Sequence, residues 1–356
     1  MPIQPRSEIE NIPEIPHGGF HANAAADILD FSSNVNPFGP SPRIWDAMRR
    51  VPIGQHPDPR AEPLRQFLAR SHHLSPRQIL VGNGSVELIY HLAVVFLRAG
   101  DRAFIVEPTF GEYRHACSIM GAEIVRWRLD AADNFALDAD ALIRAARQIN
   151  PRLFFLCNPN NPTGVYIERD VIEKILRDCP DLLLVLDEAF VRFVSDAWDA
   201  RELLRHENLI LLRSLTKDYA LTGLRVGYAI GNEHMITALE KVQPPWSVNA
   251  LAQAASLAAL EDEAHLRHSL SEIARAKTQW MDDLTRLKMT PLPSRTNFFL
   301  LPVVSATEFA AQLLARKIRV RDCASFGLPA HVRIATRRVD ENARLTRALS
   351  EITRAK

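Results

Sequence analysis

The chain has 356 residues, enough for one large domain with a smaller satellite or for two domains of ordinary size. Apolar residues make up 47% and charged residues 24%, which excludes an intrinsically disordered chain and predicts a globular protein. The formal net charge of +1 provides no general field that would attract nucleic acid or anionic lipid, so we expect neither as a partner.

The cysteines and the N-terminal segment narrow the class of protein further. The four cysteines stand far apart with no C-x-x-C pair, which argues against a disulfide framework and against a metal site. The segment "MPIQPRSEIENIPEIP" carries acids and prolines where a signal peptide needs an apolar stretch. The apolar segment "LIYHLAVVFL" is too short to span a bilayer. We therefore expect a cytoplasmic protein without a membrane anchor.

Short β-rich segments alternate with helical segments from about residue 79 onward. The predicted strands cover residues 78–82, 102–107, 122–127, 152–158, 182–188, 208–214 and 225–231. Amphipathic helices are predicted near residues 85–97, 110–120, 138–147 and 168–178. These helices are long enough to connect parallel strands, and several strands are continuously apolar, as strands covered on both faces must be. The alternation predicts an α/β domain with a mostly parallel seven-stranded sheet and helices on both faces.

The pattern changes after "QPPWSVNALAQ". A long amphipathic helix is predicted there, followed by "TNFFLLP", "KIRVRD", "HVRIAT" and a last helix, which is typical of a smaller α+β domain. The first 40 residues are rich in proline and glycine, and we expect them to pack against this C-terminal part. The predicted large domain therefore covers residues 41–249, and the small domain combines residues 1–40 with 250–356.

Several polar residues follow predicted strands at the edge of the sheet where ligands of α/β proteins bind. "LLLVLDEAF" ends its strand in Asp187, "NPNNPTG" contains Asn161, and "SLTK" ends in Lys217. "VGNGS" forms a turn and opens a helix at Gly84 and Ser85. Each feature alone has an ordinary explanation, such as an exposed loop lysine, a turn or a helix cap. Their joint occurrence at neighbouring strand ends favours a functional site.

The residue types match the needs of pyridoxal 5′-phosphate. The cofactor aldehyde requires an amine, which Lys217 provides, and the protonated ring nitrogen requires a carboxylate such as that of Asp187. At about 3 Å and an effective dielectric constant near 20, that attraction is roughly 5 kcal/mol before desolvation. The phosphate requires donors at a helix start together with hydroxyls and a fixed charge. Candidates for the phosphate site are Gly84, Ser85, Ser214, Thr216 and Arg225.

The combination of "NPNNPTG", "DEAF", "SLTK" and "GLRVGY" resembles the class I and II aminotransferases over about residues 17–350. The resemblance implies fold type I, pyridoxal phosphate as cofactor and a homodimer. It implies that Lys217 binds the cofactor aldehyde and that Asp187 pairs with the ring nitrogen. It further implies that Asn161 donates to the ring oxygen, that Phe110 stacks on the ring and that Arg225 binds the phosphate.

Peripheral segments favour one branch of this group. "HGG", "DFSSNVNPFGP", "PWSVNALAQ" and "VRDCASF" resemble the threonine-phosphate decarboxylases of cobalamin biosynthesis, which remove CO₂ from L-threonine O-3-phosphate. Histidinol-phosphate aminotransferases share the cofactor motifs and are the alternative. Both kinds of enzyme take a phosphorylated substrate. A protein that keeps the fold as a binding module is opposed by the intact lysine and aspartate, and a nicotinamide dehydrogenase by the missing G-x-G-x-x-G.

The predicted substrate site rests on two arginines. Arg333 in "HVRIAT" and Arg321 in "KIRVRD" could hold a phosphate and a carboxylate in bidentate fashion, although surface ion pairs would have the same sequence pattern. His17, Asn34 and Asn161 complete this set by resemblance.

Three positions depart from the family pattern. Phe190 replaces a usual tyrosine, which favours decarboxylation; His56 replaces a tyrosine that reaches the cofactor phosphate of the neighbouring subunit; and Arg192 replaces an acid. We therefore count His56 among the cofactor-binding candidates.

Overall fold

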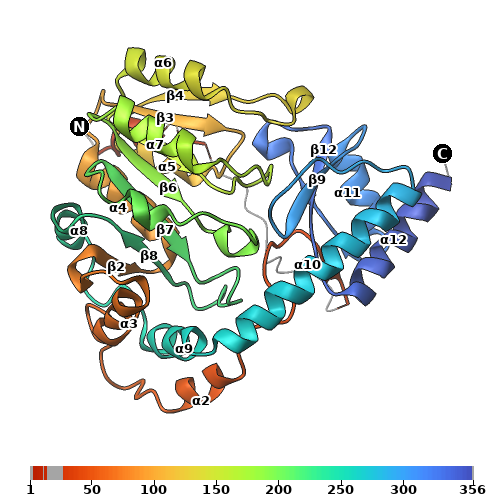
Figure 1. Ribbon diagram of the computed structural model, residues 1–356, viewed down its shortest axis with the longest axis horizontal. Coiled ribbons are helices and arrows are strands. Elements are labelled where there is room, and N and C mark those ends of the chain that lie inside the picture. Colours follow the sequence, from red (N-terminus) through yellow and green to blue (C-terminus); the bar gives the residue numbers. More distant parts are fainter. Residues whose placement is uncertain (1–2, 11, 14–26, 355–356) are drawn as a thin grey trace.

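The fold of the computed structural model consists of one large mixed sheet and a smaller unit beside it (Figure 1). The structure describes residues 3–10, 12–13 and 27–354. The strands are β1 Leu29–Asp30, β2 Ile79–Gly82, β3 Arg102–Glu107, β4 Glu123–Arg128, β5 Leu153–Cys157, β6 Leu183–Asp187, β7 Leu209–Ser214, β8 Gly227–Ile230, β9 Phe298–Pro302, β10 Ile318–Arg319, β11 Arg321–Asp322 and β12 His331–Ala335. The helices are α1 Ser7–Glu10, α2 Arg43–Arg49, α3 Glu62–His72, α4 Gly84–Phe96, α5 Glu112–Ile119, α6 Ala139–Ile149, α7 Arg169–Asp178, α8 Glu233–Glu240, α9 Ala250–Leu260, α10 Glu263–Arg286, α11 Ala306–Leu314 and α12 Val339–Arg354.

The large sheet has the strand order β2-β8-β7-β6-β5-β3-β4. All neighbouring pairs from β7 to β4 are parallel, whereas β8 runs antiparallel to both of its neighbours. All seven predicted strands of this sheet are present. After β3 the chain adds β4 on one side and then β5 on the other. The carboxyl ends of β3 and β5 therefore flank a topological switch point, where α/β sheets bind ligands.

Helices cover both faces of the sheet because successive residues of its strands point to opposite sides. In β5, Phe154 and Leu156 belong to a core with α3, α6, α7 and α9. Leu153 and Phe155 belong to a second core with α4, α5 and α8. This two-sided burial explains why the strands are apolar throughout, and it confirms the predicted layer arrangement.

The smaller unit combines the segment around β1 with the C-terminal strands and helices. Its sheets have the orders β11-β12-β9 and β1-β10, and its core includes Phe31, Trp280 and Phe299. Helix α9 was predicted to belong to this unit, but it packs against α2 and α3 beside the large sheet, and its Ala252 and Ala255 lie in the large core. The predicted boundary at residue 249 therefore separates α9 from the helices that it contacts.

The described part of the chain contains no helix that is long and apolar enough to cross a membrane. All four cysteines are buried and unpaired.

A close contact between α4 and β8 fixes where the first turn of α4 lies. A Cβ atom on Gly227 would lie 2.4 Å from the backbone nitrogen of Ser85 and 2.8 Å from the carbonyl oxygen of Arg213. Both are backbone atoms that cannot move aside. Only glycine lets the start of α4 approach the sheet this closely.

We expect Gly227→Ala to lower the free energy of unfolding by about 1–3 kcal/mol or more, because the new methyl group overlaps backbone atoms. Gly223→Ala is the matched control, since a Cβ there meets nothing within 4 Å. Urea unfolding of both variants measures the difference. Equal losses of stability would contradict the proposed close contact.

Candidate active site

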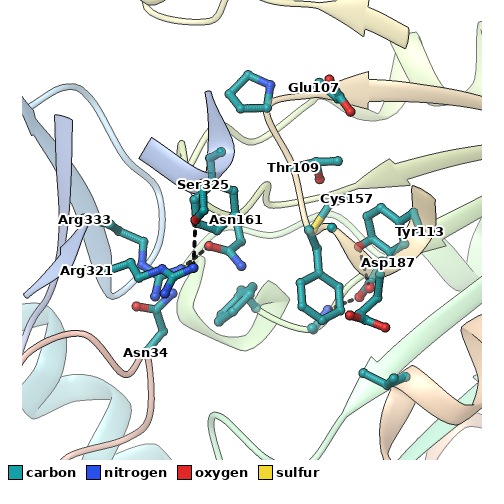
Figure 2. A pocket seen from close by; sticks show the side chains of 18 of the residues that line it. Asn34, Glu107, Thr109, Tyr113, Cys157, Asn161, Asp187, Arg321, Ser325 and Arg333 are labelled. Carbon is teal, nitrogen blue, oxygen red and sulfur yellow. Dashed lines mark hydrogen bonds between the residues drawn. The ribbon is translucent and has the colours of Figure 1, made fainter. Parts of the chain in front are cut away.

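A cavity of about 700 Å³ lies at the carboxyl ends of the central strands and extends to the small unit. Figure 2 shows Arg321, Arg333 and Asn161 toward one end of it and Asp187 with Tyr113 toward the other. The cavity brings together most of the predicted site residues: Asn34, Ser85, Phe110, Asn161, Asp187, Ser214, Thr216, Lys217, Arg225, Arg321 and Arg333.

Two predicted residues, His56 and Gly84, do not line the cavity themselves. The exposed imidazole of His56 stacks on Trp246 at a centroid distance of 4.4 Å and does not line the cavity within its own chain. Its predicted contact is with the cofactor of a second subunit and stays a prediction. Gly84 lies beneath the guanidinium of Arg225. His17 lies outside the described residues.

Asp187 is the last residue of β6, and only 3% of its surface is exposed. Burial raises the pKa of this carboxyl group to about 6, since an anion loses its hydration there. Two neutral donors oppose this effect. The Tyr113 hydroxyl donates to Oδ2 at 2.7 Å, and the Ala189 backbone N–H donates to Oδ1 at 2.9 Å. No cationic side chain among the described residues pairs with this carboxylate, which therefore suits a protonated ring nitrogen.

Lys217 follows β7 and reaches the same cavity. Burial, together with the positive charges of Arg333 and Arg225, lowers the pKa of its ammonium group to about 8. Roughly a tenth of the amine is consequently neutral at pH 7, far more than at its ordinary pKa. Only the neutral amine has the lone pair that attacks an aldehyde, so the surroundings of Lys217 favour covalent attachment of the cofactor.

The start of α4 forms a cradle for an anion. Gly84 has a φ of +78°, and a Cβ there would lie 2.8 Å from the Nη2 atom of Arg225. Glycine thus leaves room for the guanidinium above the helix N-terminus, whose free N–H groups attract negative charge. The hydroxyls of Ser214 and Thr216 lie 2.7 Å apart beside it. Backbone donors, hydroxyls and one guanidinium fit a phosphate group.

The middle of the cavity has aromatic and amide groups suited to a flat ring. Phe110 lines it and meets Tyr113 edge-on at a centroid distance of 5.7 Å. The Oδ1 atom of Asn161 accepts a hydrogen bond from Arg333, which leaves its amide nitrogen as a donor for a ring oxygen. Phe190 also lines the cavity and packs edge-on against Phe298. Lacking a hydroxyl, Phe190 cannot donate to the same oxygen.

Two guanidinium groups lie side by side at the other end, because β11 and β12 pair Arg321 with Arg333. Arg333 is 7% exposed, and burial lowers its pKa to about 10. Its terminal nitrogens donate to neutral oxygens, those of Asn161 and of the Ser32 carbonyl, and its Nε has no partner among the described residues. A buried cation with only neutral acceptors stabilises a bound anion strongly.

Some residues that line the cavity were not predicted from the sequence. Tyr113, which donates to Asp187, is the second residue of α5 and stands three positions after Phe110, which precedes that helix. The three-residue spacing from Phe110 could have indicated a second aromatic residue in the cavity wall, but not its hydrogen bond to Asp187. Cys157 pairs with Asp187 across β5 and β6. Ser325, in the 3-10 turn Ala324–Phe326, accepts a hydrogen bond from Arg321 of β11 at 2.9 Å, a contact that no local pattern indicates.

Comparison with known proteins agrees with this geometry. Residues 26–352 match the aminotransferase class I and II family. The histidinol-phosphate aminotransferase of Symbiobacterium thermophilum is 37% identical over 328 residues, which cover 91% of this chain and 90% of that protein.

Two solved structures extend the comparison. The histidinol-phosphate aminotransferase of Sinorhizobium meliloti, in complex with pyridoxal-5′-phosphate, has a TM-score of 0.84 at 27% identity and covers 92% of this chain and 91% of that chain. The L-threonine-O-3-phosphate decarboxylase of Porphyromonas gingivalis has a TM-score of 0.82 at 30% identity and covers 92% of this chain and 100% of that one.

The chain belongs to the aminotransferase class I and II family and has its fold type I architecture. It is an enzyme of this pyridoxal phosphate-dependent family, and its cofactor is pyridoxal 5′-phosphate. The phosphate cradle, the Lys217 amine and the Asp187 carboxylate all line or adjoin one cavity and fit this group.

The burial of Asp187 should make the apoprotein less stable than it could be. Since the folded-state pKa is raised above the ordinary value of 3.8 to about 6, the ionised carboxylate destabilises the fold above pH 6. We expect Asp187→Asn to stabilise the apoprotein at pH 8 by at most about 3 kcal/mol. The gain should shrink as the pH falls through 6 toward 4.

Urea unfolding of the apoprotein between pH 5 and pH 8 measures this effect. The exposed Asp181→Asn variant serves as the control and should show no such gain. The proposed destabilising effect of the buried carboxylate would be refuted if Asp187→Asn were no more stable than the wild type at pH 8. A gain in stability that did not depend on pH would refute it as well.

Proposed function

We propose that this enzyme is an aminotransferase for histidinol phosphate or a closely related phosphorylated amine. The observation that carries the proposal is that Arg321 and Arg333 line the same cavity as Lys217 and Asp187. A phosphate bound by the two guanidiniums would place the rest of a small substrate beside the lysine. The curated relatives support this substrate class, since the most similar of those described above is a histidinol-phosphate aminotransferase.

The charged residues that line the cavity have different roles in the reaction. The bound cofactor supplies an electron sink for the bond that breaks at the carbon bearing the amino group. Lys217, with a pKa near 8, can hold or release a proton at Nζ close to that carbon. Arg333 and Arg321 orient the substrate by its anionic group, and the bond that lies perpendicular to the cofactor ring is the one that reacts.

Decarboxylation of L-threonine O-3-phosphate is the second candidate. Phe190 stands where the family usually has a tyrosine, and the peripheral segments resemble the decarboxylases. The decarboxylase structure from Porphyromonas gingivalis is 30% identical to this chain. Threonine phosphate carries both a phosphate and a carboxylate, which would use both guanidiniums. The similarity to curated aminotransferases supports amino transfer more strongly, although the sequence motifs favoured decarboxylation.

Two assays on the reconstituted holoenzyme separate the candidates. Histidinol phosphate with 2-oxoglutarate should yield glutamate if the enzyme is the proposed aminotransferase. Threonine phosphate alone should yield CO₂ without any keto acid if it is the decarboxylase. Keto acid-independent CO₂ without glutamate formation would replace the first candidate by the second. A holoenzyme inactive in both assays would overturn both.

Arg333 provides a further prediction for either reaction. We expect Arg333→Gln to lower kcat/KM for the phosphorylated substrate roughly 100-fold or more, because a buried charge-assisted hydrogen bond to the anion is lost. The variant should still bind the cofactor, because Asp187, Lys217 and the phosphate cradle are intact. Arg316→Gln is the control, since Arg316 pairs with Glu351 outside the cavity. Unchanged steady-state kinetics of Arg333→Gln would show that the substrate lies elsewhere.

We also propose that the enzyme is a cytoplasmic homodimer. Trp45, Ile53 and Trp246 expose 55%, 81% and 45% of their surface, and His56 stacks on Trp246. Burying these side chains against a second copy would stabilise a dimer. Sedimentation equilibrium should give twice the 40.1 kDa chain mass, whereas a monomer at micromolar concentration would contradict the proposal.

A further inference from the structure

Tyr113 occupies a position in the cavity wall that no predicted function explains. It is the second residue of α5, it is fully buried, and its hydroxyl donates to Oδ2 of Asp187 at 2.7 Å. Figure 2 shows Tyr113 directly beside Asp187, whereas the arginines lie toward the other end of the cavity. Together with the Ala189 N–H, which donates to Oδ1, the tyrosine gives each carboxylate oxygen one neutral donor.

Aromatic neighbours hold the Tyr113 ring in place. Phe155 of β5 stacks on it at 5.0 Å with an interplanar angle of 12°, and Phe110 meets it edge-on at 5.7 Å. A ring packed on two sides has little freedom to rotate about its side-chain bonds. The hydroxyl is thus preorganised toward Asp187, and the carboxylate is held in one orientation.

The other groups around Asp187 offer few hydrogen bonds. On the neighbouring strands it pairs with Cys157 of β5 and Leu212 of β7. The Cys157 thiol donates instead to the Pro159 carbonyl oxygen at 3.3 Å. The negative charge of Glu188 opposes ionisation of Asp187, and the Ala189 N–H occupies Oδ1. Within the described part of the chain, Tyr113 is therefore the side chain that donates to Oδ2.

We propose that Tyr113 is a positioning residue that keeps the Asp187 carboxylate ionised and correctly oriented for the cofactor ring. The inference rests on the cofactor of the proposed function, but not on which of the two reactions follows. A neutral donor suits this role, because it stabilises the carboxylate without competing with the ring nitrogen as a second cation.

A tyrosine also keeps this hydrogen bond independent of pH. Burial raises the pKa of the Tyr113 hydroxyl well above its ordinary value, so the group remains a donor over the whole working range. A histidine there would change its charge near neutral pH and alter the carboxylate with it. Asp187 itself, with a pKa near 6, is then the group whose protonation weakens cofactor binding in acid.

Replacement of Tyr113 by phenylalanine tests the role, since it retains the packed ring and removes only the hydroxyl. We expect the dissociation constant of pyridoxal 5′-phosphate at pH 7.5 to rise roughly ten- to hundredfold. The pH midpoint below which affinity falls should move upward by about one unit. Both quantities come from equilibrium binding of the cofactor to the apoprotein and require no turnover.

Tyr90→Phe is a matched control. Tyr90 donates its hydroxyl to another carboxylate, that of Glu112, at 2.6 Å, so the chemical change is the same. The pH midpoint of cofactor affinity in the Tyr90→Phe variant should stay at the wild-type value. Tyr113→Phe should also have little further effect in an Asp187→Asn background, because an amide does not titrate.

If the pH midpoint of cofactor affinity shifts no more in Tyr113→Phe than in Tyr90→Phe, the proposal is wrong. An undiminished effect in the Asp187→Asn background would also overturn it, because a loss of packing alone would act there as well. A holoenzyme that shows the expected shift but catalyses neither reaction would refute the proposed function and leave this inference intact.

Discussion

The carboxylate of Asp187 is an anion at the end of a fully buried strand, and the organisation of the site depends on how that charge is compensated. Its two donors are neutral, so burial still raises its pKa to about 6. A protonated ring nitrogen supplies the missing positive charge. Its attraction to the carboxylate is strongest where water is excluded. The apoprotein thus carries a local instability that cofactor binding relieves, a common trade of stability for function.

The remaining contacts of the cofactor follow from the fixed geometry of the sheet. Gly227 lets α4 lie against β8, and Gly84 leaves room for Arg225 over the first turn of that helix. The phosphate cradle therefore has a defined place relative to the ends of β6 and β7. Lys217 lines the same cavity, and the charges of Arg225 and Arg333 help to lower its pKa. One set of cations thereby serves binding and activates the amine.

The sequence was sufficient to predict the large sheet, since its strands are apolar throughout. The helices that cover it show a clear helical repeat of apolar residues. The sequence also placed Asp187, Asn161 and Lys217 at strand ends, which parallel topology brings to one edge. The hydrogen bond from Tyr113 could not be predicted, because it depends on the packing between α5 and β5 rather than on local pattern. The position of α9 was also missed: its small apolar residues suit either domain, and only tertiary contacts decide.

The ion pair between Asp187 and the cofactor ring can be observed directly by nitrogen NMR of enzyme reconstituted with ¹⁵N-labelled pyridoxal 5′-phosphate. At pH 8 the account predicts a protonated ring nitrogen in the wild type and an unprotonated one in Asp187→Asn. An unprotonated nitrogen in the wild-type enzyme, or the same protonation state in both proteins, would contradict it.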